Sequence, residues 1–175
     1  MYSFFELLKT RRSIRNYLQQ AVEPDKINRI TNAALMSPAS KRSNPWEFIV
    51  VENRDTLIKL SESRPHGSQF LAGAPLGIVV IADTTKSDVW MEDASIASII
   101  MQLQAQDLGL GSCWIQVYGR NKDDNTTSES YIRELLDIPQ QYAVMNIISI
   151  GYPDEERKPY DEEKLQTVKV HTEKF

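Results

Sequence analysis

Apolar residues along the chain follow two spacings, one typical of helices and one typical of buried strands. The helical spacing predicts helices shortly after Ser3, from Glu23 to Ser37, and over Asn53–Glu62, Asp93–Leu108 and Ser128–Leu136. Short runs rich in β-branched and aromatic residues predict strands over Trp46–Val51, Gly77–Ala82, Ser112–Val117 and Ala143–Ile150. No internal repeat or linker interrupts this pattern, so residues 1–175 are interpreted as one domain.

Two segments add to this pattern. Asp93–Leu108 is apolar around most of its circumference, which indicates a central helix packed on several sides. The alternation of helices and strands by itself favours an α/β domain with a parallel sheet. Residues 152–175 form a charged C-terminal extension, and its alternating piece Thr167–Val170 predicts a strand that pairs with another element, of which a partner subunit is one candidate.

Composition excludes several classes of protein. The 175 residues are 41% apolar and carry a net charge of -4, which suits a folded domain and gives no electrostatic reason to expect nucleic acid. The single cysteine and two distant histidines argue against a disulfide or a metal site, although a site of carboxylates alone stays open. No signal peptide or run of ~20 apolar residues is evident, so we expect a cytoplasmic protein away from membranes.

The densest charge is the cluster of Arg11, Arg12 and Arg15 around Ser13. Guanidinium groups this close repel one another unless an anion neutralises them, and Arg binds phosphate through two parallel hydrogen bonds. The alternative is a solvated helix end, where the helix dipole favours cations. Charge alone favours that alternative.

Other candidates are weaker. Residues 37–46 could line a polar ligand or form an ordinary solvated loop. Gly109–Gln116 has neither the P-loop nor the Rossmann order of glycines. Cys113 has no assignable partner and is interpreted as a buried apolar residue rather than a nucleophile. Glu92–Asp93 is interpreted as favourable charge at a helix start, and Asp154–Glu156 as solvated.

Four segments, taken in order, resemble the nitroreductase family of FMN-dependent oxidoreductases: Arg11–Arg15, Ser37–Trp46, Gly109–Gln116 and Ile150–Pro153. Each is weak alone, but together they span nearly the whole chain. The resemblance implies an α+β homodimer with two FMN sites at the subunit interface. Its mixed, largely antiparallel sheet is flanked by helices and extended by a C-terminal strand exchanged between subunits, which replaces the parallel sheet above.

The resemblance also implies a role for each matching residue. Arg11 and Ser13 would hold the FMN phosphate and ribityl chain with Arg12 beside them, and Arg15 would lie near the pyrimidine edge. The loop lent by the partner subunit would comprise Pro38, Ala39, Ser40 and Arg42. The segment along the ring, with a backbone N–H facing N5, would comprise Trp114, Ile115, Gln116 and Val117. The tail cations near the phosphate would be Arg157 and Lys158.

The implied activity is hydride transfer from NADH or NADPH, via flavin N5, to an electron-poor acceptor such as a nitroaromatic or quinone, by a ping-pong scheme without a metal. Two alternatives stay open: an FMN store or sensor without NAD(P)H turnover, and a flavoenzyme of this fold with dehalogenase or flavin-fragmenting chemistry. Arg42 and Asn44 replace the Asn and Gln frequent in the family, and the short Gly119–Thr127 loop predicts an open pocket. Lys41, Arg42 and Arg120 are all candidates for recognising the 2′-phosphate of NADPH.

Overall fold

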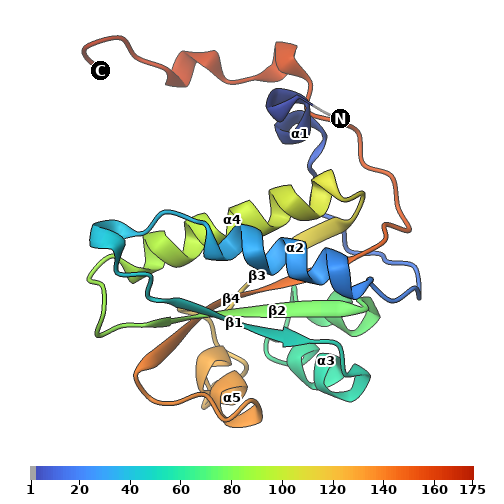
Figure 1. Cartoon of the computed structure of the whole chain (residues 1–175), viewed down its shortest axis with the longest axis vertical. Helices are drawn as coiled ribbons and strands as arrows, with labels where there is room; N and C mark the ends of the chain where they lie inside the picture. The colour runs from blue at the N-terminus through green and yellow to red at the C-terminus, as the bar shows by residue number, and fades with distance from the viewer. Residues whose placement is uncertain (1–2) are drawn as a thin grey trace.

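The computed structural model describes residues 3–175, which form a four-stranded antiparallel sheet with helices on both faces (Figure 1). The sheet order is β1-β2-β4-β3. The strands are β1 (Trp46–Val51), β2 (Leu76–Asp83), β3 (Gly111–Gln116) and β4 (Tyr142–Gly151). The four predicted strands are therefore confirmed to within a residue or two, and so is the α+β class.

The parallel sheet expected from alternation alone is wrong, and the connections show why. Val51 at the end of β1 pairs with Gly77 at the start of β2, so the chain re-enters the sheet at the end where it left. The same holds at Gln116 and Asn146, where β3 meets β4. A helix between two strands does not by itself make a parallel crossover.

The helices begin close to where the sequence predicts them. They are α1 (Phe4–Thr10), α2 (Pro24–Leu35), α3 (Arg54–Ser61), α4 (Trp90–Asp107) and α5 (Ser128–Leu135). Side-chain oxygens of Ser3, Asn53 and Thr127 accept backbone N–H groups at three of the helix starts. α4 begins three residues earlier than its apolar pattern indicates.

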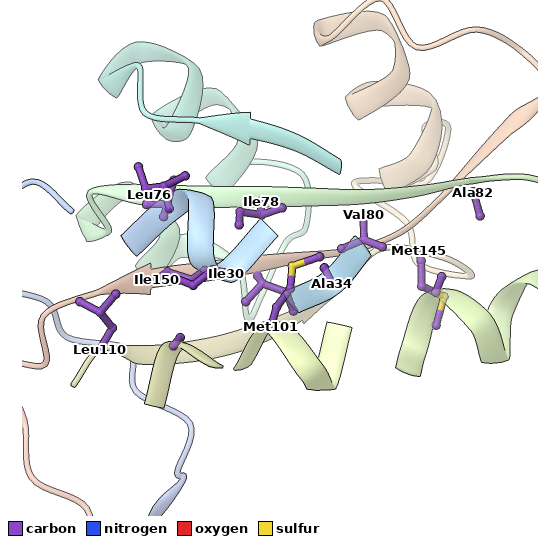
Figure 2. Packing of buried hydrophobic residues seen from close by; sticks show 14 of the residues in the cluster. Ile30, Ala34, Leu76, Ile78, Val80, Ala82, Met101, Leu110, Met145 and Ile150 are labelled. Carbon is purple, nitrogen blue, oxygen red and sulfur yellow. The ribbon is translucent and has the colours of Figure 1, made fainter. Parts of the chain in front are cut away.

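The core lies on both faces of the sheet. On one face, α2 and α4 pack against alternate side chains of β2, and Figure 2 shows Met101 of α4 beside Ala34 of α2. On the other face, α3 and α5 pack against the intervening side chains Val79 and Ile81. All eight residues of β2 are buried, which is why that strand reads as a continuous apolar run.

α1 and the C-terminal tail stand apart from this core (Figure 1). No residue of α1 is buried, and residues 156–175 are all exposed. Within the single chain Thr167–Lys169 forms a 3₁₀ turn, and the pairing of Thr167–Val170 as a strand with a partner subunit stays a prediction. Among the described residues no strand lies beside it to accept its backbone groups, and the N–H of Val170 bonds locally to the carbonyl of Thr167, at 2.9 Å. Among residues 3–175, no helix is long and apolar enough to cross a membrane.

Candidate functional site

The arginine-rich segment lies directly on the edge strand β3. The N–H of Ile14 donates to the carbonyl of Ser112 at 3.0 Å, and Ser13 forms an isolated parallel bridge to the same residue. A Cβ on Gly111 would lie only 2.8 Å from the Cβ of Ile14, so glycine permits this approach. The fold thus brings together Arg11–Arg15 and Gly109–Gln116, two of the segments that the sequence singles out.

Beyond Ser112, the outer edge of β3 carries outward-facing backbone groups. The carbonyl of Ser112 points away from β4 toward Ile14, whereas the N–H of Val117 points inward and donates to Met145 of β4 at 3.2 Å. Backbone groups of successive strand residues face alternate edges. The N–H groups of Trp114 and Gln116 therefore point out of the sheet, while Ile115 and Val117 face β4.

The three arginines of the segment have different surroundings. Arg12 donates to the carbonyl of Lys158, and its guanidinium lies 4.7 Å from the ring centroid of Tyr160. Arg15 lies 5.7 Å from the ring centroid of Phe70. Within residues 3–175, the half-buried guanidinium of Arg11 has neither a carboxylate partner nor a hydrogen bond. The Arg15 guanidinium likewise has no carboxylate partner among the described residues, so Arg11 and Arg15 are both cations of the cluster that remain to be neutralised.

Cys113 lies buried beneath this cluster, as expected. Burial raises the pKa of its thiol, while the charge of Arg15, the hydroxyl of Ser13 and the charge of Arg11 act in the opposite direction. The geometry agrees, because Ser13 bridges to Ser112, the residue before Cys113 in β3. A buried thiol with a raised pKa is a poor nucleophile, which supports the interpretation of Cys113 as a packing residue.

Glu155 is a site residue that the sequence did not reveal. It was expected to be solvated, but its carboxylate accepts the N–H groups of Arg15, at 2.5 Å, and Asn16, at 3.2 Å. It also forms a 2.5 Å ion pair with Arg157, so this predicted phosphate cation is already partnered in the chain. Burial acts to raise the pKa of Glu155, but the two N–H groups and Arg157 outweigh it and lower the pKa.

Two hollows flank the segment. One, of about 250 Å³, is lined by Arg12, the Gly109–Gly111 turn and Arg157. The other, of about 360 Å³, is lined by Arg15, Tyr17, Phe70 and other residues. Tyr17, which lines the second hollow, is anchored in the buried core by a 2.7 Å contact between its hydroxyl and that of Ser149.

The loop with Pro38, Ala39, Ser40 and Arg42 lies elsewhere in the chain. The N–H of Ser40 donates to Asp93 in the first turn of α4, at 2.8 Å, whereas Gly111 follows the end of that helix. The helix rise from Asp93 to Asp107 is about 20 Å. The single chain therefore does not bring this loop to Arg11–Arg15. Asp93 does lie at a helix start, as expected, but its carboxylate also anchors the loop.

The fold and these motifs define a class of protein. A sequence profile of the nitroreductase family matches residues 8–65 and 59–152. The chain therefore belongs to the nitroreductase family.

Individual relatives match over most or all of their length. The chain is similar to the solved structure of an FMN-dependent nitroreductase from Clostridium difficile R20291, with 53% identity, a TM-score of 0.97, and coverage of 98% of this chain and 99% of that one. It is 36% identical, over 100% of both chains, to an Archaeoglobus fulgidus protein provisionally named NADH dehydrogenase/NAD(P)H nitroreductase. It is 24% identical to an FMN reductase [NAD(P)H] of Bacillus subtilis, over 87% of this chain and 67% of that protein.

Proposed function

We propose that this chain is an FMN-dependent oxidoreductase that transfers a hydride from NADH or NADPH to an electron-poor acceptor such as a nitroaromatic or a quinone. The observation that carries the proposal is the docking of Arg11–Arg15 on β3. It sets an unpartnered guanidinium beside outward-facing backbone N–H groups. The guanidinium can bind a phosphate, and the backbone N–H groups can donate to the acceptor atoms of a flavin ring. These residues therefore fit FMN. The names of the relatives support the same cofactor and donors.

In this proposal each group has a task. Arg11 and Ser13 bind the phosphate and ribityl chain, and the N–H of Gln116 orients the ring. Arg15 stands at the pyrimidine edge, where its charge favours the more negative reduced ring. When bound, FMN would supply the chemistry of hydride transfer between NADH or NADPH and the acceptor.

We further propose that the protein works as a homodimer. The loop at Pro38–Arg42 is about 20 Å along α4 from the arginine segment, so it fits the role of a loop lent to the partner's site. Ile96 and Ile99 of α4 and Phe4 and Phe5 of α1 are exposed apolar side chains that a second copy would cover. Exchange of the tail between subunits belongs to the same proposal.

The proposal is tested by a visible spectrum of the protein loaded with FMN, recorded before and after anaerobic addition of NADH and then NADPH. Loss of the oxidised-flavin band with either nucleotide is expected. A bound flavin that neither nucleotide bleaches would instead support an FMN store or sensor, and no bound flavin would overturn the proposal.

The site assignment has its own test. Arg11→Ala should weaken FMN binding about tenfold or more, because charge-assisted hydrogen bonds to phosphate are lost. Arg54→Ala, at the exposed start of α3, is the matched control and should leave FMN affinity unchanged. Equal FMN affinity in both variants would reject Arg11 as a phosphate ligand. Cys113→Ser should keep most of the turnover.

A further inference from the structure

Arg64 lies in the loop that follows α3, and its guanidinium packs over Gly67. A Cβ placed on Gly67 would lie 3.7 Å from Nη1 of Arg64. Gln69 holds this loop by accepting the N–H of Gly67 at 2.8 Å and donating to the carbonyl of Arg64 at 2.9 Å. The loop is therefore ordered by its own hydrogen bonds, and the Arg64 side chain is held in a defined place.

No carboxylate within residues 3–175 forms an ion pair with Arg64. Four arginines are half-buried in residues 3–175, and two of these, Arg12 and Arg133, donate to carbonyl or carboxylate oxygens. Arg11 and Arg64 do not, and Arg11 is the proposed ligand of the cofactor phosphate. The carboxylate nearest in sequence, Glu62, forms no ion pair with Arg64 among the described residues. A half-buried cation without a partner is costly unless it meets an anion.

A second cation, Arg120, lies at the start of α5, where its carbonyl accepts the N–H of Ser128 at 2.9 Å, and α5 is joined to α3, the helix before Arg64, by the hydrogen bond from Tyr131 to Lys59. Burial and, after it, the positive charge of Arg120 lower the pKa of Arg64. Arg120 itself has no ion pair or side-chain hydrogen bond within residues 3–175. Two guanidinium groups that repel each other at an exposed loop are the arrangement that binds a carboxylate or phosphate.

Both arginines come from segments that border the proposed flavin site. The loop of Arg64 continues to Phe70, whose ring lies below Arg15. Arg120 follows β3, four residues beyond Gln116, and its N–H donates to Val117 at 3.0 Å. The preceding α3 and following α5 lie on the same face of the sheet and are joined by a 3.1 Å hydrogen bond from Tyr131 to Lys59 (Figure 1).

We infer that Arg64 and Arg120 form a binding site for an anionic group of the substrate, either the 2′-phosphate of NADPH or a carboxylate on the electron acceptor. The inference rests on the proposed function, because it places this anion beside the flavin. Arg64 provides the ordered, half-buried contact and Arg120 the exposed one. The enzyme would then favour charged substrates over neutral ones of the same shape.

Two matched probe pairs test the inference on the protein loaded with FMN. NADPH and NADH differ by one phosphate, and 4-nitrobenzoate and 4-nitrobenzamide differ mainly in charge. Each half-reaction is followed by the flavin absorbance for the wild type, Arg64→Gln, Arg120→Gln and the control Arg54→Gln. The quantity compared is the ratio of apparent affinities within a pair, NADPH over NADH or 4-nitrobenzoate over 4-nitrobenzamide. In one pair or both, Arg64→Gln and Arg120→Gln should each lower this ratio about tenfold or more.

The outcomes show which substrate carries the anion, and they also show whether the anion site exists. Loss of discrimination in the nucleotide pair alone identifies the donor phosphate, and loss in the nitro pair alone identifies an acceptor carboxylate. The inference is overturned if both variants keep the wild-type affinity ratio in both pairs. It is also overturned if the variants weaken binding of the charged and neutral probes equally. Arg120→Gln is a surface change, so it provides a folded variant if Arg64→Gln does not fold.

Failure of the proposed function is distinguished by a separate measurement. Calorimetric titration of 4-nitrobenzoate and 4-nitrobenzamide is run on the chain with and without added FMN. If the wild type binds no FMN, the proposed function fails. If the wild type prefers 4-nitrobenzoate and Arg64→Gln abolishes this preference, the anion site is still supported. If the wild type shows no preference, the site does not bind a carboxylate on the electron acceptor.

Discussion

The sheet with its packed helices and the outlying pair of α1 and the C-terminal tail differ in what they bury. Every residue of β2 is buried, and α4 contributes Met101 and Ala97 to the same interior. α1 buries nothing, although Phe4 and Phe5 are apolar. The outlying region is more charged but still carries large apolar side chains, such as Leu165 and Val168, which this chain leaves exposed. The sheet region is stabilised by one chain, and the outlying region has the composition of a surface that a second chain covers.

The largest effect should come from removing a core side chain. Met101→Ala should lower the free energy of unfolding by about 2–5 kcal/mol, because it leaves a cavity between α2, α4 and the sheet. Urea denaturation measures this loss, and Ile99→Ala on the exposed side of α4 is the control. At a dilution where the protein is monomeric, similar losses in the two variants would contradict the division between a self-contained core and an open surface.

A smaller effect is expected where the arginine segment Arg11–Arg15, which follows α1, meets the sheet. Gly111→Ala would place a methyl group against Ile14, at a cost of about 1–3 kcal/mol, and should also weaken FMN binding because Arg11–Arg15 must shift. Gly73→Ala is the matched control, since nothing lies within 4 Å of the added Cβ. FMN titration and thermal unfolding measure both effects. Unchanged FMN affinity in Gly111→Ala would separate the segment from the cofactor site.

The contact of Glu155 with the segment should make the protein sensitive to acid. Its folded-state pKa is lowered, so the stability it contributes is complete above its unfolded value of about 4.3 and is lost as the pH falls through the folded value. Glu155→Gln should remove this part of the pH dependence and cost about 1–2 kcal/mol at neutral pH. Unfolding curves between pH 3 and 7 measure it. A wild-type slope in the variant would show that other carboxylates cause the acid sensitivity.

The sequence predicts local structure well because periodicity is a local property. The strands and helices fall within a few residues of their expected positions, and the resemblance correctly indicates an antiparallel sheet. The direction of β1 against β2 is not encoded in either periodicity, since it depends on which end of the sheet the chain re-enters. The alternation at Thr167–Val170 describes a strand only if a neighbouring strand exists, and residues 3–175 of this chain place none beside it.

The site was less predictable than the fold, for the same reason. The cluster at Arg11–Arg15 could be found because its charge is concentrated in five residues. Glu155 acts on Arg15 across 140 positions, and no feature near it in the sequence distinguishes it from Glu156. Arg64 has no signal in the sequence, because its state depends on packing over Gly67 and on the charge of Arg120.

The smallest effect on the single chain should come from the surface of α1. Phe5 is 54% exposed and lines a hollow of about 160 Å³ with Leu8, Tyr160 and Leu165. Phe5→Ser should change the unfolding free energy of dilute protein by no more than about 0.5 kcal/mol, yet weaken self-association. Light scattering over a concentration series measures the association, and Ile58→Ser on α3, 39% exposed before the change, is the control. Because α3 lies on the opposite face of the sheet, the control should associate as the wild type does. If instead both variants keep the wild-type association, α1 is not part of the interface, and the exposed apolar residues of α4 alone would have to provide it.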